Sequence, residues 1–252
     1  MRCKQIVLFN WPFYAAAALV AGAAPLLIGR MPASPWLRVP AWTGTGLVAL
    51  WLVTSLAASW IVYDRSRLMQ WDWVLQSLGF DPRSWINIHA GHDDSSEALG
   101  RLFAHAHGRV FDIYDAETMT EPSIARARVR SERERRRGTA AVVPEPADYH
   151  RLPLPNGTID VATLLLSAHE LRSDEARSAL FTELRRVLGP AGRVVVAEHL
   201  RDWANFLAYG PGFLHFHSRR TWLRCFARHR FDVHREFSIT PFVRIFVLRR
   251  LT

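Results

Sequence analysis

Two long runs without a charged residue occupy the beginning of the sequence. Residues 5–29 and 39–63 each contain 25 consecutive uncharged residues, whereas about 20 apolar residues suffice to cross the roughly 30 Å hydrocarbon core of a bilayer as a helix. The chain has 32 basic and 23 acidic residues, yet only five charged residues fall in the first 64 positions, namely Arg2, Lys4, Arg30, Arg38 and Asp64. We therefore expect residues 1–64 to form a transmembrane hairpin, with spans at about 8–29 and 42–62.

A cleaved signal peptide is the alternative for the first run. Arg2 and Lys4 are typical of its basic start, and residues 21–23, Ala-Gly-Ala, are typical of a cleavage site. The second run would still remain as a span. The distribution of basic residues around the two runs slightly favours an orientation with both termini inside the cell. We predict a two-pass protein of a bacterial inner (cytoplasmic) membrane, with both termini and the following domain in the cytoplasm.

The segment after the second run, residues 65–80, has apolar residues at a near-helical period and predicts a juxtamembrane helix. Trp71 and Trp73 would hold such a helix at the lipid headgroups. The alternative is a helix that packs on the following domain, with both tryptophans in the core.

From residue 81 to residue 252, short apolar runs alternate with helical patterns, which is typical of a parallel sheet covered by helices on both faces. Helices are expected at 95–105, 116–137 and 174–188, with a broader helical region at 202–229. Seven strands are expected at 85–90, 109–113, 139–143, 159–166, 193–199, 231–238 and 242–248.

Two stretches of this domain resemble a known family. LPLPNGTIDVATLLLSAHEL (152–171) and ALFTELRRVLGPAGRVVVAEHLRD (179–202) look like the fourth and fifth strands of class I S-adenosylmethionine-dependent methyltransferases, with the turns that precede them. The resemblance extends over about residues 81–250. It implies an α/β, Rossmann-like fold with a seven-stranded, mostly parallel sheet, and S-adenosylmethionine as the cofactor.

The resemblance also places the cofactor. The family's glycine-rich motif after the first strand falls on residues 87–93, where Gly91 is the only glycine. His89 and Asp93 must then line a reshaped site or block it. The acidic residue that holds the ribose hydroxyls falls on Asp112, with Asp115 as a nearby substitute. The predicted cofactor-binding residues are Asn87, His89, Gly91, Asp93, Asp112, Asp148, Tyr149 and Ser167, with Asp148 on the adenine amino group and Tyr149 stacked on the ring.

Each of these residues has an ordinary structural alternative. Asp112 and Asp148 are also the kind of residue that caps a helix or a turn. His89, His92 and Asp93 together are a set that suits zinc or iron, but nothing else supplies an obvious further ligand. Cys3 and Cys225 form no CxxC pair. We therefore expect no metal.

The candidate catalytic residues follow the fourth and fifth strands. His169 and Glu170 end the fourth strand and His199 ends the fifth, so all three are expected at the carboxyl edge of the sheet, where ligands bind in such folds. His169 is the best candidate for a base because an unperturbed imidazole titrates near pH 6.5. Glu198 also ends the fifth strand. The alternatives are a helix-capping role for His169 and an arginine salt bridge for Glu198.

Arginines dominate residues 126–137, which hold seven of them. A solvated helix face is one interpretation. Contact with anionic lipid is the other, because each arginine close to a membrane surface gains about 1 kcal/mol. No nucleic-acid partner is expected, since no aromatic residues or binding motif accompany the arginines.

These features lead to two hypotheses. The first is a membrane-anchored, S-adenosylmethionine-dependent methyltransferase that acts on a lipophilic or membrane-delivered small acceptor, including a lipid. The second is a non-catalytic, membrane-tethered interaction module with a degenerate methyltransferase fold, which the loss of glycines at His89 and Asp93 motivates.

Overall fold

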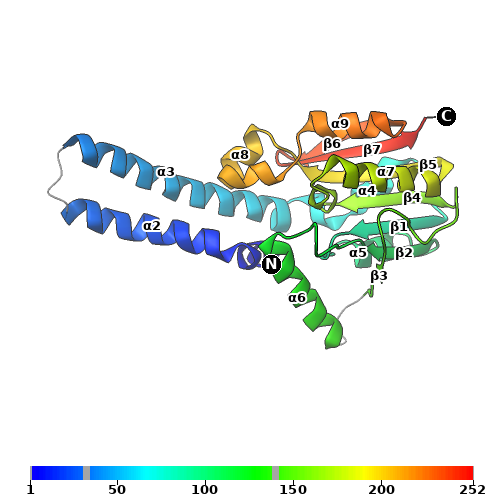
Figure 1. Ribbon diagram of the computed structural model, residues 1–252, viewed down its shortest axis with the longest axis horizontal. Helices are drawn as coiled ribbons and strands as arrows, with labels where there is room; N and C mark the ends of the chain where they lie inside the picture. The colour runs from blue at the N-terminus through cyan, green and yellow to red at the C-terminus, as the bar shows by residue number, and fades with distance from the viewer. Residues whose placement is uncertain (1, 31–34, 138–141, 252) are drawn as a thin grey trace.

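A computed structural model of the chain describes residues 2–30, 35–137 and 142–251. Two long apolar helices extend away from an α/β body (Figure 1). The chain begins with α1 (Arg2–Phe9) and α2 (Trp11–Arg30), which are separated by a break at Asn10. It then runs back toward the body as α3 (Pro35–Trp60). Both α2 and the continuous helix that begins at Pro35 are long and apolar enough to cross a membrane, with mean hydropathies of 1.7 and 1.8.

A seven-stranded sheet forms the body, in the order β3-β2-β1-β4-β5-β7-β6. The strands are β1 (Ser84–His89), β2 (His107–Asp112), β3 (Glu145–Pro146), β4 (Ile159–Leu165), β5 (Leu188–His199), β6 (Phe231–Thr240) and β7 (Val243–Arg250). The first five are parallel, and β7 is antiparallel to both β5 and β6. This confirms the predicted seven-stranded, mostly parallel Rossmann-like fold. The predicted strand at 139–143 lies partly outside the described residues, and β3 instead comprises two residues further along the chain.

Helices cover both faces of the sheet. One face packs against α7 (Asp174–Val187) and α9 (Arg219–Arg228), and the other against α4 (Asp72–Leu78) and α5 (Ser96–Leu102). The start of α7 follows from its sequence, because the Ser173 hydroxyl accepts a hydrogen bond from the Ala176 amide and satisfies a donor that the first helical turn leaves free.

The juxtamembrane segment is part of the body rather than an interfacial helix. It folds as two short turns, η1 (Ile61–Arg65) and η2 (Arg67–Gln70), followed by α4. Trp71 is 1% and Trp73 is 5% exposed, both within the core on the α4–α5 face of the sheet. The interpretation in which these tryptophans sit at headgroups is therefore wrong, and the core alternative is correct. Burial in the core is more favourable for these two indoles than a headgroup position, because each removes a large apolar area from water.

Four further elements lie near the carboxyl edge of the sheet. They are α6 (Pro122–Arg136), α8 (Trp203–Tyr209) and η4 (Gly210–His215), together with the short turn η3 (Ala168–Glu170) that follows β4. Figure 1 shows α8 beside α3 and α6 beside the N-terminus. The first helical residue of α6 is Pro122, which suits a position that has no intrahelical donor to lose.

Candidate functional site: a cavity between the sheet edge and the N-terminal helices

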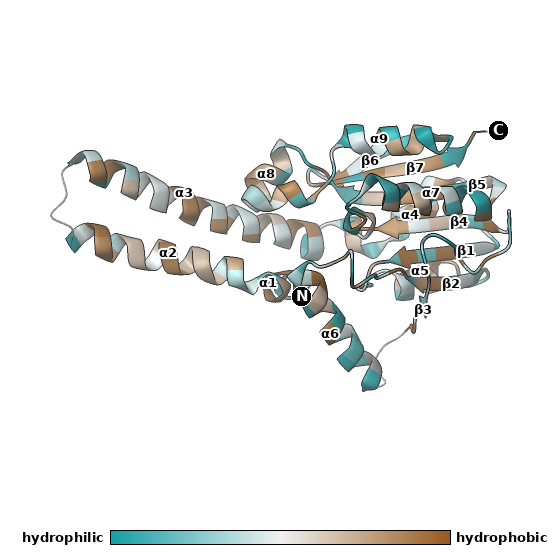
Figure 2. Cartoon of the chain, in the orientation of Figure 1, coloured by the Kyte–Doolittle hydropathy of each residue, from teal (hydrophilic) through white to brown (hydrophobic). Residues whose placement is uncertain are grey.

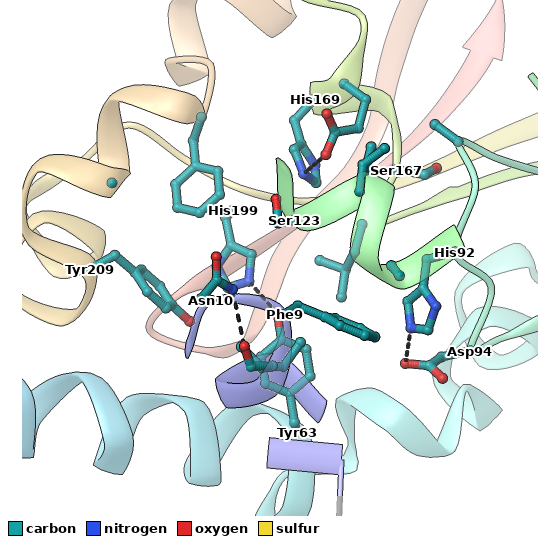
Figure 3. A pocket seen from close by; sticks show the side chains of 18 of the residues that line it. Phe9, Asn10, Tyr63, His92, Asp94, Ser123, Ser167, His169, His199 and Tyr209 are labelled. Carbon is teal, nitrogen blue, oxygen red and sulfur yellow. Dashed lines mark hydrogen bonds and ion pairs between the residues drawn. The ribbon is translucent and has the colours of Figure 1, made fainter. Parts of the chain in front are cut away.

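The parallel strands leave a crevice where the chain order reverses between β1 and β4, the place at which open α/β sheets bind ligands. A cavity of about 410 Å³ opens there. Ala90 after β1, Ser167 after β4 and His199 at the end of β5 line its floor. Its other walls come from α1, α2, α3, α6, α8 and η4 (Figure 3).

The N-terminal helices supply the apolar wall. The residues they contribute include Phe9, Phe13, Tyr14, Trp51 and Tyr63. The hydroxyls of Tyr14 and Ser55 are 3.0 Å apart and tie α2 to α3 at the cavity. The membrane-like hairpin and the sheet edge therefore build one site together, an arrangement that the sequence does not indicate.

A tight turn after β4 presents the candidate catalytic residues. Leu166 has a φ of 57°, a left-handed conformation that is costly for a residue with a branched side chain. It turns the chain so that the amides of Ser167 and Ala168 both donate to Glu198 Oε1, at 3.0 and 2.7 Å. Glu198 is completely buried, so this turn is rigidly attached to β5.

The same glutamate orients His169. Its Oε2 lies 2.7 Å from His169 Nδ1, and Glu170 Oε1 lies 3.3 Å from His169 Nε2. Burial alone lowers the pKa of His169, but the two carboxylates outweigh burial and raise it to about 10. With these groups alone around it, the protonated form of His169 is favoured. The role of His169 as a base stays a prediction, and the residue lies at the cavity as expected.

His199 is the neutral histidine of the site. Its Nδ1 faces two acceptors, Asn205 Oδ1 at 3.1 Å and the Phe242 carbonyl at 3.0 Å, so Nδ1 carries the hydrogen. Its Nε2 then accepts from the Tyr63 hydroxyl at 3.2 Å. Burial, reinforced by the nearby His169, lowers the pKa of His199 to about 4. A neutral imidazole is thus held against the end of the second apolar run.

Apart from Ser167, the predicted cofactor residues lie near the ends of β1, β2 and β3, outside the cavity lining. Gly91 has a φ of 85°, which favours glycine, and its amide donates to Asp112 Oδ1 at 2.9 Å. His89 is 5% exposed, and neither ring nitrogen has a hydrogen-bond partner. His89 Nδ1 is 3.9 Å from Asp112 Oδ1. An unpaired buried imidazole beside a strand-end carboxylate is what a polar ligand would satisfy.

Arg128 occupies the position above Gly91. Its guanidinium is 2.6 Å from Asp112 Oδ2 and lies 4.0 Å from the centre of the Tyr114 ring. A Cβ placed on Gly91 would come within 2.8 Å of the Arg128 side chain. The carboxylate expected to hold a ribose is therefore already paired with Arg128.

The other predicted cofactor residues have partners inside the protein. Asp93 Oδ1 accepts from the amides of Ser95 and Ser96 at 2.9 Å each and caps α5. The side-chain amide of Asn87 donates to the hydroxyls of the same two serines. Neither residue lines the cavity. Both form hydrogen bonds that hold the loop after β1.

Asp148 and Tyr149 are similarly engaged. Asp148 Oδ1 accepts from the His150 backbone and ring at 2.8 Å. Tyr149 is 6% exposed and packs in the core on the α7–α9 face of the sheet. Its ring therefore offers no open face for adenine here. Ser167, by contrast, lines the cavity and donates to the Ile88 carbonyl at 2.9 Å.

The sequence offered His89, His92 and Asp93 as an alternative set of metal ligands, and this set is wrong. In the described part of the chain, His89, His92 and Asp93 do not converge. His92 pairs instead with Asp94 at 3.2 Å. The one ligand-like group in the described residues is His169, Glu170 and His215. From the sequence, His215 is expected in the substrate wall or the core rather than in a ligand group, because it lies 45 positions beyond Glu170 and only the path of η4 brings it back.

Comparisons with known proteins agree with this architecture. Residues 98–196 match the family model described as a methyltransferase domain. The chain is 33% identical over 119 residues to the ubiquinone/menaquinone biosynthesis C-methyltransferase UbiE of Burkholderia vietnamiensis, covering 47% of this chain. The matched residues and the fold are similar to those of class I S-adenosylmethionine-dependent methyltransferases. The match spans 44% of the length of that curated relative.

Solved structures share the fold of the methyltransferase domain. The S-adenosylmethionine-dependent methyltransferase of Aquifex aeolicus has a TM-score of 0.54 at 16% identity, covering 73% of this chain and 93% of that one. The geranyl diphosphate C-methyltransferase of Streptomyces coelicolor has a TM-score of 0.52 at 16% identity, with coverages of 72% and 78%. The pyocyanin biosynthetic protein PhzM reaches 0.57 at 17% identity, with coverages of 98% and 72%. At these identities the likeness establishes the fold alone.

Proposed function

We propose that the chain is a membrane-anchored methyltransferase that transfers a methyl group from S-adenosylmethionine to a lipophilic acceptor that enters from the bilayer. The observation that carries the proposal is the shared cavity, whose floor is the methyltransferase sheet edge and whose apolar wall is the N-terminal hairpin. The curated relative is named for ubiquinone and menaquinone, and one structural neighbour for geranyl diphosphate. Both names describe apolar or isoprenoid chemistry.

In this proposal the cofactor binds at the strand-end residues, with Arg128 moved away from Asp112. Asp112 at the end of β2 would hold the ribose hydroxyls, and Gly91 would allow close approach of the backbone. The cofactor supplies a methyl group already activated on a sulfonium. The protein then has to hold the acceptor in line and exclude water. Ser167, His199 and the aromatic wall of the cavity are placed to do so.

A third apolar element supports the membrane assignment. Residues 203–214, which form α8 and most of η4, contain no charged residue, and Trp203 is 77%, Leu207 65% and Leu214 53% exposed. The Leu207 carbonyl accepts from Thr54 of α3 at 3.2 Å, and Gly210 approaches Trp51. Figure 2 shows α8 beside α3 of the apolar hairpin. Contact with lipid would remove this exposed apolar surface from water, which is favourable.

Methyl transfer to a lipid-soluble product is the direct test. The full chain in nanodiscs of native bacterial lipid, supplied with methyl-labelled S-adenosylmethionine, should yield label that extracts into organic solvent. Ala127→Trp would fill the cavity from α6, where Ala127 is buried, and should reduce transfer at least tenfold. Cofactor binding should persist, because Ala127 does not touch Asp112.

Ala125→Trp is the matched control, because Ala125 is exposed on the same helix. It should leave transfer unchanged. Label found only in a water-soluble product would rule out a lipophilic acceptor. Equal losses in the two variants would show that the cavity is not the acceptor site.

The proposed topology places both termini and the methyltransferase domain in the cytoplasm. We expect a phosphatase reporter fused after residue 252, which is active only outside the cytoplasm, to stay inactive, and a fluorescent reporter at the same place to be bright. The reason is that two spans return the chain to its starting side, where S-adenosylmethionine is made. An active phosphatase fusion would contradict both the topology and the cytoplasmic reaction.

The second candidate function, a tethered interaction module without turnover, is favoured by one observation. Arg128 already neutralises Asp112, so the domain is complete without a ligand at that carboxylate. Calorimetric titration of the full chain in detergent with S-adenosylmethionine separates the two. Absence of binding to both the wild type and Arg128→Ala would support the module and end the enzymatic proposal.

Contact of α6 with anionic lipid stays a proposal. Part of its arginine run faces the protein, because Arg126 Nε donates to the Phe9 carbonyl at 2.6 Å and Arg128 binds Asp112. Arg130 and Arg136 form ion pairs with Glu134 and Glu132 within the helix. The helix is therefore neither a purely solvated face nor a free basic surface.

A further inference from the structure

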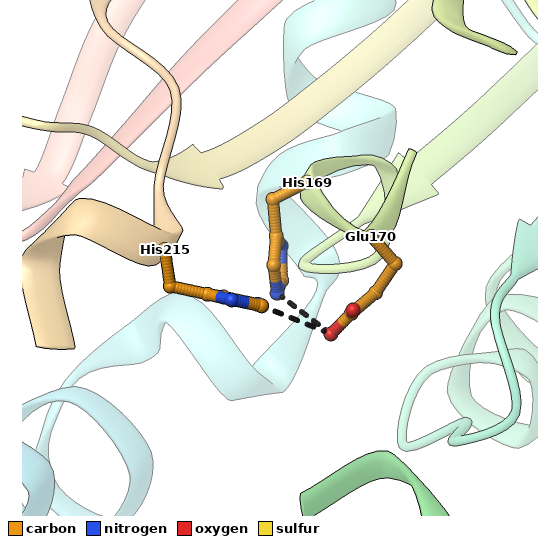
Figure 4. A group of neighbouring side chains, drawn as sticks. All are labelled: His169, Glu170 and His215. Atoms are coloured by element: carbon orange, nitrogen blue, oxygen red, sulfur yellow. Dashed lines mark ion pairs between the residues drawn. The ribbon is translucent and has the colours of Figure 1, made fainter. Parts of the chain in front are cut away.

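The strongest unassigned feature is a compact group of three side chains at the rim of the cavity. His169 and Glu170 come from η3, and His215 comes from the end of η4 (Figure 4). Their ligand atoms all lie within 4.8 Å of one another. Glu170 Oε1 is 3.3 Å from His169 Nε2 and 3.5 Å from His215 Nε2. In a tetrahedral site with metal–ligand bonds of about 2.0–2.1 Å, ligand atoms lie about 3.3 Å apart.

Carboxylates stand behind both imidazoles. Glu198 Oε2 binds His169 Nδ1 at 2.7 Å, and Glu121 Oε1 lies 3.4 Å from His215 Nδ1. In metal sites the ligating histidine commonly donates its second ring nitrogen to a carboxylate, which fixes the tautomer and leaves the other nitrogen for the metal. Here that other nitrogen is Nε2 in both histidines, and both Nε2 atoms face the same carboxylate.

Glu170 is the acidic member of the group and is nearly buried, with 8% of the residue exposed. Its Oε1 faces both histidines, whereas Oε2 is buried without a hydrogen-bond partner. An unsatisfied buried carboxylate oxygen is costly. Together, Glu170 and the fully buried Glu198 place two carboxylates at the cluster, which favours the binding of a divalent cation there.

We propose that His169, Glu170 and His215 bind a zinc ion. Two imidazoles and one carboxylate are the donor set of catalytic zinc sites, which keep a fourth position open. Magnesium is disfavoured because it prefers oxygen ligands and octahedral geometry. His169 and Glu170 line the cavity, so the fourth position is available to an oxygen of the acceptor. The acceptor contact rests on the proposed function, but zinc binding itself does not.

The geometry points to an acceptor with a hydroxyl, phenol or carbonyl oxygen beside the methylated position. Zinc would fix such an oxygen at the carboxyl edge of the sheet and polarise it. An acceptor that lacks this oxygen would lose one of the few polar contacts in a largely apolar cavity.

The test is metal binding by the full chain in detergent, without a histidine tag and after removal of metals with a chelator. Calorimetric titration with zinc should show one ion per chain, and cobalt should give the intense visible absorption of a tetrahedral site. His215→Gln should weaken zinc binding at least tenfold, and so should Glu170→Gln. These measurements need neither cofactor nor acceptor, so failure of the proposed function would not affect them.

His105→Gln is the matched control, because His105 is exposed and remote from the cluster, and its zinc affinity should equal that of the wild type. The far-ultraviolet circular dichroism of each variant shows whether it is folded. If His215→Gln does not fold, Glu170→Gln, which keeps the side-chain shape, decides the question. Absence of a stoichiometric zinc ion, equal affinity in His215→Gln and His105→Gln, or stronger binding of magnesium than of zinc would overturn the proposal.

Discussion

Asp112→Ala should weaken S-adenosylmethionine binding by at least 30-fold. The carboxylate ends β2 beside Gly91, and as an ionised acceptor pair toward the ribose hydroxyls it is worth about 2–4 kcal/mol. Calorimetric titration of the full chain measures the change. Asp115→Ala is the control, because Asp115 only closes a turn through the Glu117 amide and the Thr118 hydroxyl. Equal losses in the two variants would show that the ribose is not held at the end of β2.

Arg128→Ala should act in the opposite direction within the same experiment. Arg128 is 37% exposed and its ion pair with Asp112 is partly screened, so breaking it costs about 1 kcal/mol. Removing that cost should tighten cofactor binding about fivefold. Unchanged or weaker binding in Arg128→Ala would mean that the arginine contacts the cofactor rather than competing with it.

Glu198→Ala should destabilise the methyltransferase domain more than any other single change considered. It would leave the buried amides of Ser167 and Ala168 and the ring of His169 without their acceptor. Breaking a buried charge pair typically costs about 3–5 kcal/mol. At about 2–4 °C per kcal/mol for a domain of this size, the midpoint of thermal unfolding should fall by roughly 10 °C. Circular dichroism of the full chain in detergent measures it.

Two variants make that result specific. Glu175→Ala removes an exposed carboxylate from α7 and should change the midpoint by less than about 2 °C. Glu198→Gln keeps an oxygen for the amides but turns a donor toward His169, so its loss should be intermediate. A midpoint for Glu198→Ala equal to that of Glu175→Ala would show that the turn after β4 does not depend on this glutamate.

The eroded glycine motif has a different meaning in three dimensions than in the sequence. His89 and Asp93 stand where the family has glycines, and the sequence predicts that they line or block the site. Asp93 caps α5 instead, whereas His89 is buried beside Asp112 and its ring nitrogens have no hydrogen-bond partner. The two residues thus have different surroundings: Asp93 supports the start of α5, and His89 lies beside the end of β2. Only the hydrogen-bond partners distinguish them.

The regular elements of the domain were predictable from local patterns. The strands at β1, β2 and β4 and the helix α7 follow from apolar periodicity and from the Ser173 cap, because these signals depend on neighbouring residues. The apolar hairpin likewise follows from length and hydropathy. The two tryptophans after the hairpin could not be assigned in this way, since an indole suits a headgroup region and a protein core equally well.

By itself, the sequence determined the two apolar runs, the order of strands and helices, and the resemblance to class I methyltransferases. The tertiary structure decided which distant residues meet. It brings Trp51 of the hairpin to Gly210, Arg128 to Asp112, and His215 to His169 and Glu170. The physical reason is that hydropathy and capping act between neighbours in the chain, whereas a cavity or a ligand group depends on contacts across the fold. Those contacts exist only when the hairpin, the sheet edge and η4 have packed together.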